Sequence, residues 1–187
     1  ILIDGDDVHI TNINRQIHAL YDTIGIPKVD VMAERIKKIN PSIDVIPIKQ
    51  FYFQETRNIF FKYNYDYIID AIDTIDNKVD LISTVYNKNI PIISCMGAGN
   101  RIYPTKLQVC DIADTRVCPL ARIVRKELRK KGIYNGIKVV YSTETPLKSR
   151  YMNSSSVGSF SFVPSVAGLI IAAEVVRDIL NTNSFSF

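Results

Sequence analysis

Short apolar runs alternate along the chain with segments whose apolar residues recur every three or four positions. The runs rich in β-branched and aromatic residues predict strands at residues 1–3, 43–48, 67–69, 90–94 and 139–142. The helical periodicity predicts helices at residues 28–39, 77–88, 117–131 and 165–180. This alternation is typical of an α/β fold in which helices flank a mostly parallel sheet.

Some segments carry a further prediction. In the first predicted helix, the apolar stripe that would face the core consists of Val29, Met32, Ile36 and Ile39. In the last predicted helix, the corresponding stripe consists of Val166, Leu169, Ile170, Ala173 and Val176. Residues 106–112 alternate loosely, which predicts an antiparallel or edge strand. Residues 147–161 are polar and rich in serine, and predict a mobile loop.

Composition limits the class of protein. With 187 residues, 47% of them apolar and 22% charged, the chain is expected to form a single domain over residues 1–187. The net charge of +4 says little about partners. Residues 160–176 are the most apolar stretch, but Pro164 and Glu174 interrupt it. We therefore predict a buried helix and no integral membrane segment, since a span needs about 20 apolar residues.

The start of the chain is unusual. It opens without Met inside the apolar run Ile1–Ile3, followed by acidic residues, which predicts that the true N-terminus is missing. In dinucleotide-type folds an acidic residue after the second strand holds the ribose, about 20 residues beyond a glycine-rich phosphate loop. If Asp4 has this role, the phosphate loop and its βα unit lie upstream. The alternative is an ordinary acidic turn.

The following loop concentrates polar groups. Asn12 and Arg15 lie in the run from His9 to Gln16, and Lys28 opens a predicted helix after Gly25. Amide donors and cations near a ribose-binding carboxylate suit a triphosphate. A solvated loop is the alternative.

Three elements give this pattern a specific resemblance. The segment from Asp4 to Gln16, the segment Gly25–Lys28 and the segment Asp70–Asp73 resemble, in order, the motifs of the ATP-dependent adenylating superfamily of ubiquitin-activating, ThiF and MoeB proteins. The branch that it resembles more closely is that of the tRNA threonylcarbamoyladenosine dehydratases, through residues 65–74, 96–100, 117–122, 141–144 and 158–168. The resemblance implies a Rossmann-like α/β fold that lacks its N-terminal βα unit here.

The resemblance also implies a site for ATP and Mg²⁺. Arg15 and Lys28 would contact the phosphates, and Asp73 would lie beside Mg²⁺ and the α-phosphate. These three residues are the candidate catalytic groups.

Other residues would complete nucleotide binding. Asp4 would hold the ribose, and Asn12 and Thr74 would contact the nucleotide. An ATP-binding part would occupy residues 1–104, and a C-terminal part with the basic helix and the dimer or substrate elements would occupy residues 105–187.

The implied function is adenylation of the threonylcarbamoyl carboxylate on a tRNA adenosine next to the anticodon, followed by a cyclising dehydration. The implied setting is a cytoplasmic homodimer, with an arginine from the partner subunit that precedes residue 1 and with a possible sulfur-transfer partner. Without its phosphate loop, the chain alone is expected to be inactive.

Several alternatives remain at this point. Adenylation of the C-terminus of a ubiquitin-like or sulfur-carrier protein is one, and an inactive fragment is another. Cys95, Cys110 and Cys118 form no Cys-x-x-Cys pair, so neither zinc nor a disulfide scaffold is expected, and a reducing compartment is favoured. An NAD-dependent reductase could use Asp4, but it would not account for Arg15, Lys28 and Asp73 together.

The helix at residues 117–131 has an apolar side and a strongly cationic side. The candidate tRNA contacts are Arg122, Arg125, Lys126, Arg129 and Lys130. Like charges cluster here instead of alternating with acids, which favours contact with a phosphate backbone. A solvated helix face is the alternative. Cys118, His9 and His18 are expected to be structural.

Overall fold

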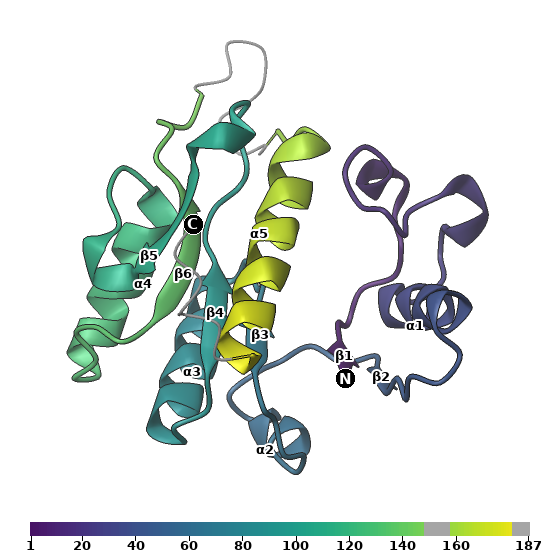
Figure 1. Ribbon diagram of the computed structural model, residues 1–187, viewed down its shortest axis with the longest axis horizontal. Coiled ribbons are helices and arrows are strands. Elements are labelled where there is room, and N and C mark those ends of the chain that lie inside the picture. The colour runs from purple at the N-terminus through teal and green to yellow at the C-terminus, as the bar shows by residue number, and fades with distance from the viewer. Residues whose placement is uncertain (148–157, 181–187) are drawn as a thin grey trace. The chain divides into compact units, whose positions relative to one another are not determined.

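The structure is a computed structural model that describes residues 1–147 and 158–180 (Figure 1). The chain divides into two compact units, residues 1–62 and residues 63–187. Residue 104, the predicted end of the ATP-binding part, lies within the second unit. Within the described residues, no helix has the length and apolar character needed to cross a membrane.

The first unit combines a short parallel ladder with one long helix. Strand β1 (Leu2–Ile3) pairs in parallel with β2 (Pro47–Ile48). Helix α1 (Lys28–Ile39) follows Pro27, and α2 (Arg57–Phe60) is a single turn. Two further short helices span Ile10–Asn12 and Tyr21–Thr23. The predicted strand at residues 43–48 is therefore shorter than expected.

The stripe predicted for α1 is only partly correct. Val29 is buried, as expected, and Ala33 joins it, whereas Ile39 in the last turn is 72% exposed. The helix ends at Ile39, and Asn40 is already extended, as Pro41 predicts, because a residue before proline disfavours helical backbone angles.

The second unit contains a four-stranded sheet. Its strands are β3 (Ile68–Asp70), β4 (Ile92–Cys95), β6 (Lys138–Ser142) and β5 (Leu107–Asp111), in that spatial order. The first three are parallel, and β5 pairs antiparallel with β6 at the edge. The prediction of a mostly parallel sheet with an antiparallel edge strand near residues 106–112 is confirmed.

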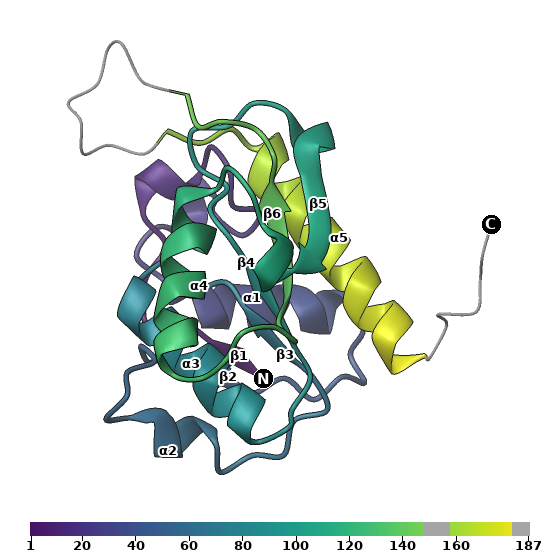
Figure 2. The ribbon, with the colours of Figure 1, turned by 90° about the vertical axis from the view of Figure 1, so that its left-hand side faces the viewer.

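Helices cover both faces of this sheet. Helices α3 (Ile75–Asn87) and α4 (Pro119–Lys130) pack against one another, and α5 (Phe162–Ile179) covers the opposite face (Figures 1 and 2). The core under α5 joins Ile93 of β4 and Val140 of β6 to Ala167 and Ile171 of the helix. The α/β class predicted from the sequence is therefore confirmed.

The predicted core face of α5 is only partly correct. Of its residues, Ile170 packs against the core, as expected. The buried side chains are Val163, Ala167 and Ile171, whereas Leu169 and Val176 are 70% and 54% exposed. The sequence of α5 is apolar around much of its circumference, so periodicity alone does not select a face. The choice follows from β6, where Lys138 forms ion pairs with Glu174 and Asp178 on the buried side. The predicted loop at residues 147–161 lies mostly outside the described residues.

Candidate nucleotide site and basic surface

The acidic segment after β1 forms a compact turn in the first unit. The Asp4 carboxylate accepts a hydrogen bond from the Asp6 backbone N–H at 2.8 Å. A Cβ atom on Gly5 would come within 2.5 Å of the Phe51 ring, so only glycine fits between the two aspartates without a shift. The turn thus fixes Asp4 directly after the strand, at the position predicted for a ribose-binding carboxylate.

Lys28 lies against this acidic turn. Its ammonium group is 2.6 Å from the Asp6 carboxylate, and its backbone N–H donates to the Asp6 carbonyl at 3.0 Å. The pKa of the His18 imidazole is lowered by burial and by the Lys28 charge, against an opposing effect of Asp4. Asp4, His18 and Lys28, from three parts of the sequence, therefore share one electrostatic environment.

The loop at residues 9–16 is held by its own side chains. Asn12 is buried, and its Oδ1 accepts the His9 backbone N–H at 3.0 Å. Arg15 donates from Nη1 to the Thr11 carbonyl at 2.8 Å and to Asn14 Oδ1 at 2.9 Å. Asn12 therefore fixes the shape of the loop, and the two hydrogen bonds of Arg15 hold its guanidinium group against the same loop. The prediction that His9 is structural agrees with its contact with Thr11 at 2.9 Å.

The end of β3 contains an ion pair that the sequence analysis missed. Lys78 and Asp70 have fully buried side chains, 2.8 Å apart. Asp70 also accepts from Ser94 Oγ at 2.5 Å and from the Ile72 N–H at 2.9 Å, and Lys78 donates to the Ile72 carbonyl at 2.8 Å. The cluster fixes the β3–α3 turn. A lysine in the first turns of a helix, where cations are disfavoured, is a signal that could have revealed it.

Asp73 and Thr74 lie in the turn that this cluster fixes. Both are exposed; Thr74 is the residue directly before α3, and its hydroxyl accepts from Asn77 at 3.1 Å. Among the described residues, the Asp73 carboxylate has no hydrogen-bond or ion-pair partner. An accessible carboxylate oxygen at the carboxyl end of a parallel strand suits Mg²⁺, which binds one or two carboxylates together with substrate phosphates.

The cysteines occupy three separate environments. Cys118 is buried at the start of α4, Cys95 ends β4, and Cys110 lies in β5. Burial raises the pKa of the Cys95 thiol, which keeps the thiol protonated and makes it a poor nucleophile. Within the described residues, no three Cys, His, Asp or Glu side chains form a group that could hold a metal ion.

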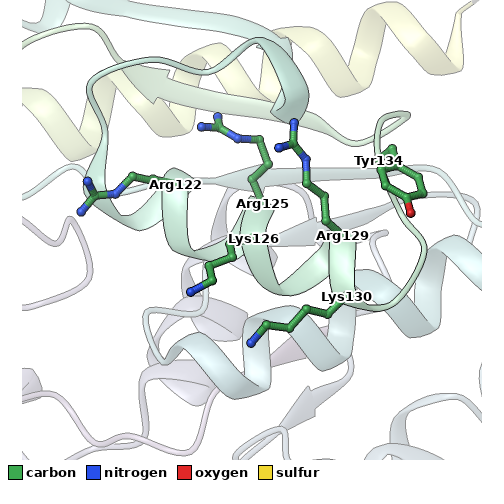
Figure 3. A pocket seen from close by; sticks show the side chains of 6 residues that line it. All are labelled: Arg122, Arg125, Lys126, Arg129, Lys130 and Tyr134. Carbon is green, nitrogen blue, oxygen red and sulfur yellow. The ribbon is translucent and has the colours of Figure 1, made fainter.

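The cationic side of α4 lines a shallow hollow together with a nearby tyrosine (Figure 3). Its volume is 480 Å³, and its lining residues are Arg122, Arg125, Lys126, Arg129, Lys130 and Tyr134. The predicted tRNA contacts therefore lie on one surface. Tyr134, which the sequence analysis did not select, is 64% exposed and adds an accessible ring.

These cations are not equivalent. Arg125 is half-buried and donates to the Thr115 and Ile112 carbonyls at 2.8 and 3.3 Å, and Lys130 pairs with Glu127 at 2.8 Å. Among the described residues, the side chains of Arg122, Lys126 and Arg129 form no hydrogen bond or ion pair with another side chain. Val117, the first residue of the helix predicted over residues 117–131, instead precedes the helix with a positive φ of 64° and is 54% exposed. The helix begins two residues later, at Pro119, because proline suits the first helical position.

Comparison with known proteins identifies relatives of the whole chain. The ThiF family sequence model matches residues 1–187. The tRNA threonylcarbamoyladenosine dehydratase of Bacillus subtilis is 47% identical over 194 residues, which cover 96% of this chain and 76% of that protein. The crystal structure of the Escherichia coli enzyme TcdA in complex with ATP superposes with a TM-score of 0.88 at 35% identity, over 98% of this chain and 76% of that one.

Proposed function

Because the chain belongs to the ThiF family and, within it, to the tRNA threonylcarbamoyladenosine dehydratases, we propose that it uses ATP to activate the threonylcarbamoyl carboxylate on a tRNA adenosine next to the anticodon. A carboxylate oxygen attacks the α-phosphorus of ATP, which forms an acyl adenylate and releases pyrophosphate. A nucleophile within the same modification then displaces AMP and closes a ring, with net loss of one water. The identity of 47% over 96% of the chain carries this proposal.

Catalysis of this reaction depends mainly on fixed positive charges and on the positions of the reacting groups. Adenylation moves negative charge onto the leaving pyrophosphate, so fixed cations lower the barrier by about 3 kcal/mol each, as for an oxyanion donor. Arg15 and Lys28 are the candidates, since both are held by short contacts to their own unit. Ring closure needs no nucleophile from the protein, because an intramolecular attack has a high effective concentration.

The first unit supplies the groups proposed for the nucleoside and the phosphates. Asp4 follows β1 and binds the ribose hydroxyls, and Arg15 contacts the phosphates. Lys28 is paired with Asp6 at 2.6 Å, so phosphate oxygens join or replace that carboxylate when ATP binds. Asn12 contributes through the loop, whose shape it fixes with its bond to the His9 N–H.

The second unit supplies the group proposed for the metal. Asp73, with Thr74 beside it, would hold Mg²⁺ together with phosphate oxygens. Two observations support this role. The Asp73 carboxylate is exposed, and the buried pair of Asp70 and Lys78 holds the turn that carries it. When bound, Mg²⁺ neutralises phosphate charge and orients the α-phosphate for attack.

The hollow on α4 is proposed as a tRNA-binding surface. Arg122, Lys126 and Arg129 are exposed and available for phosphates, whereas Arg125 and Lys130 already have protein partners. Arg125 therefore contributes positive charge to this surface while its guanidinium group stays bonded to the protein. The exposed Tyr134 ring offers a face on which an unpaired base stacks.

The setting of the protein is proposed from the family and the sequence. We expect a cytoplasmic homodimer, and the resemblance also suggests a sulfur-transfer protein as a partner. The exposed Leu169 and Val176 on α5 are apolar side chains of the kind that a dimer interface covers.

The proposal is tested by pyrophosphate release from ATP with the full-length protein. Threonylcarbamoylated tRNA is expected to stimulate release, and unmodified tRNA and a ubiquitin-like carrier protein are the matched controls. Chromatography of the digested tRNA should show the cyclised nucleoside. Stimulation by the carrier protein alone would instead identify a carrier-activating enzyme and overturn the proposal.

A further inference from the structure

Arg101 is a buried arginine that forms no ion pair with any residue in the described part of the chain. It lies in the loop that follows β4, is 2% exposed, and donates from Nη1 to the Gly99 carbonyl at 2.9 Å. Its Nε and Nη2 atoms are buried, and among the described residues neither has a hydrogen-bond partner. A buried and unpaired ionic group costs several kcal/mol, so such a group calls for a partner.

The two unpaired atoms form one edge of the guanidinium group. Nε–H and one Nη2–H point in parallel, at the spacing of the two oxygens of a carboxylate or phosphate group. Nη1, on the other edge, anchors the group to the loop backbone. The free edge is therefore a preformed fork for an oxyanion.

Among residues 1–147 and 158–180, no carboxylate forms an ion pair with this fork. The nearby Glu144 carboxylate accepts the backbone N–H groups of Ile102 at 3.1 Å and Tyr103 at 3.0 Å, and it forms no ion pair with Arg101. Residues 148–157 and 181–187, which the structure does not describe, contain no Asp or Glu in the sequence. An oxyanion from outside the described residues is the partner that this fork fits best.

The position in the fold is that of a ligand site. Strand β4 pairs in parallel with β3, with Ser94 opposite Asp70, so the loop to Arg101 and the turn to Asp73 leave the same edge of the sheet. Ligands of open α/β sheets bind beyond this carboxyl edge. The loop is also held in place, because Asn100 bonds to Gly158 through its backbone N–H and its side chain, both at 2.7 Å.

We propose that Arg101 binds a substrate oxyanion through Nε and Nη2. This inference rests on the proposed function, because the reaction supplies two such groups: the threonylcarbamoyl carboxylate and the phosphates of the nucleotide or the tRNA. Arg101 is then a substrate-binding residue, and its burial strengthens the ion pair by excluding water.

Arg101→Met in the full-length protein separates this role from a structural one. The variant keeps the length of the side chain and removes an unpaired buried charge, so the thermal midpoint should stay unchanged or rise. Pyrophosphate release should show a Michaelis constant about tenfold or more above that of the wild type for one substrate. A rise for modified tRNA alone identifies the carboxylate or a tRNA phosphate, and a rise for ATP alone identifies a nucleotide phosphate.

Small probes distinguish the sources and do not need turnover. N-carbamoyl-L-threonine carries only a carboxylate, and AMP carries only a phosphate; the probe that binds should raise the thermal midpoint of the wild type but not of Arg101→Met. Arg101→Lys keeps the positive charge but lacks the fork, so it should bind the same probe more weakly than the wild type. Arg35→Met, on the exposed side of α1, is the control and should behave as the wild type.

The outcomes separate the two proposals. A lowered midpoint in Arg101→Met, with both Michaelis constants and both probe responses unchanged, would show a structural role and overturn the inference. Full binding by Arg101→Lys would also contradict it, because the fork would then be dispensable. If the wild type itself releases no pyrophosphate with modified tRNA, the proposed function fails, while the probe titrations still decide the role of Arg101.

Discussion

The buried pair of Asp70 and Lys78 shows at the scale of single residues how this fold holds a reactive turn. Burying two charges is costly, and the Coulomb attraction repays the cost only where further hydrogen bonds satisfy both groups. Here Ser94 and the backbone of Ile72 provide those bonds. The pair therefore adds little net stability, but it determines where the turn leaves β3 and so where Asp73 stands.

Removal of one partner should expose the cost of the other. Lys78→Met leaves the Asp70 charge buried without a counter-ion, and it should lower the free energy of unfolding by about 3–5 kcal/mol. Urea denaturation measures the change. Asp70→Asn combined with Lys78→Met should recover more than half of the loss, because asparagine keeps the bonds to Ser94 and Ile72 without a charge.

A matched control addresses lysine removal as such. Lys131→Met replaces an exposed lysine and should change the free energy of unfolding by no more than about 0.5 kcal/mol. Equal losses in Lys78→Met and in the double variant would contradict the account, since the cost would then not come from the unpaired carboxylate.

Helices in this protein are oriented by a few polar contacts as much as by apolar stripes. On α5, Asp178 accepts from the Tyr67 hydroxyl and from Lys138, each at 2.7 Å. Burial tends to raise the pKa of Asp178, but the bonds from Lys138 and Tyr67 outweigh it, so the pKa is lowered. These contacts connect the helix to β6 and to the residue directly before β3, and they place an otherwise ambiguous apolar helix in one orientation.

The cationic side of α4 permits a prediction for the element as a whole. Lys126→Glu and Arg129→Glu should each weaken binding of tRNA and should lower the slope of log affinity against log salt by about 1 per lost phosphate contact. Filter binding or fluorescence anisotropy over a range of salt concentrations measures both effects. Neither change should alter the thermal midpoint, since both side chains are exposed.

Arg125 provides an internal contrast in the same helix. Its bonds to Thr115 and Ile112 are lost in Arg125→Glu, so this variant should lose thermal stability as well as affinity. Arg35→Glu makes the same change of net charge on α1 and should leave tRNA binding near the wild-type value. If Arg35→Glu weakens binding as much as Arg129→Glu, the effect is one of total charge, and α4 is a solvated face.

The sequence was sufficient where the signal is local. Strand-like runs, the proline after α1 and the alternation of residues 106–112 predicted the class of the fold and its edge strand, because each depends on neighbouring residues. It was insufficient where a long-range contact decides. Thr115 as the partner of Arg125, Ser94 as the partner of Asp70 and the rotation of α5 depend on residues distant in sequence, and no periodicity encodes them.

At the scale of the whole molecule, the proposed catalytic groups fall in both units. Arg15 and Lys28 belong to residues 1–62, and Asp73 belongs to residues 63–187. Each unit holds its own groups in place. In the first unit, Arg15 bonds to its own loop and Lys28 pairs with Asp6. In the second unit, the buried ion pair of Asp70 and Lys78 fixes the turn that carries Asp73. The proposed adenylation step would require groups from both sets to act together.

This requirement predicts a measurable coupling. Arg15→Ala and Asp73→Asn should each lower the rate of pyrophosphate release about 100-fold or more, because each removes charge stabilisation of one transition state. The double variant should lose far less activity than the two single losses multiplied together, because the effects of groups that act as a unit are not additive. Arg35→Ala, an exposed control, should keep the wild-type rate, and all variants should keep the wild-type thermal midpoint. A double variant that shows the full product of both losses would mean that the two residues act independently, and it would remove the case for a shared step.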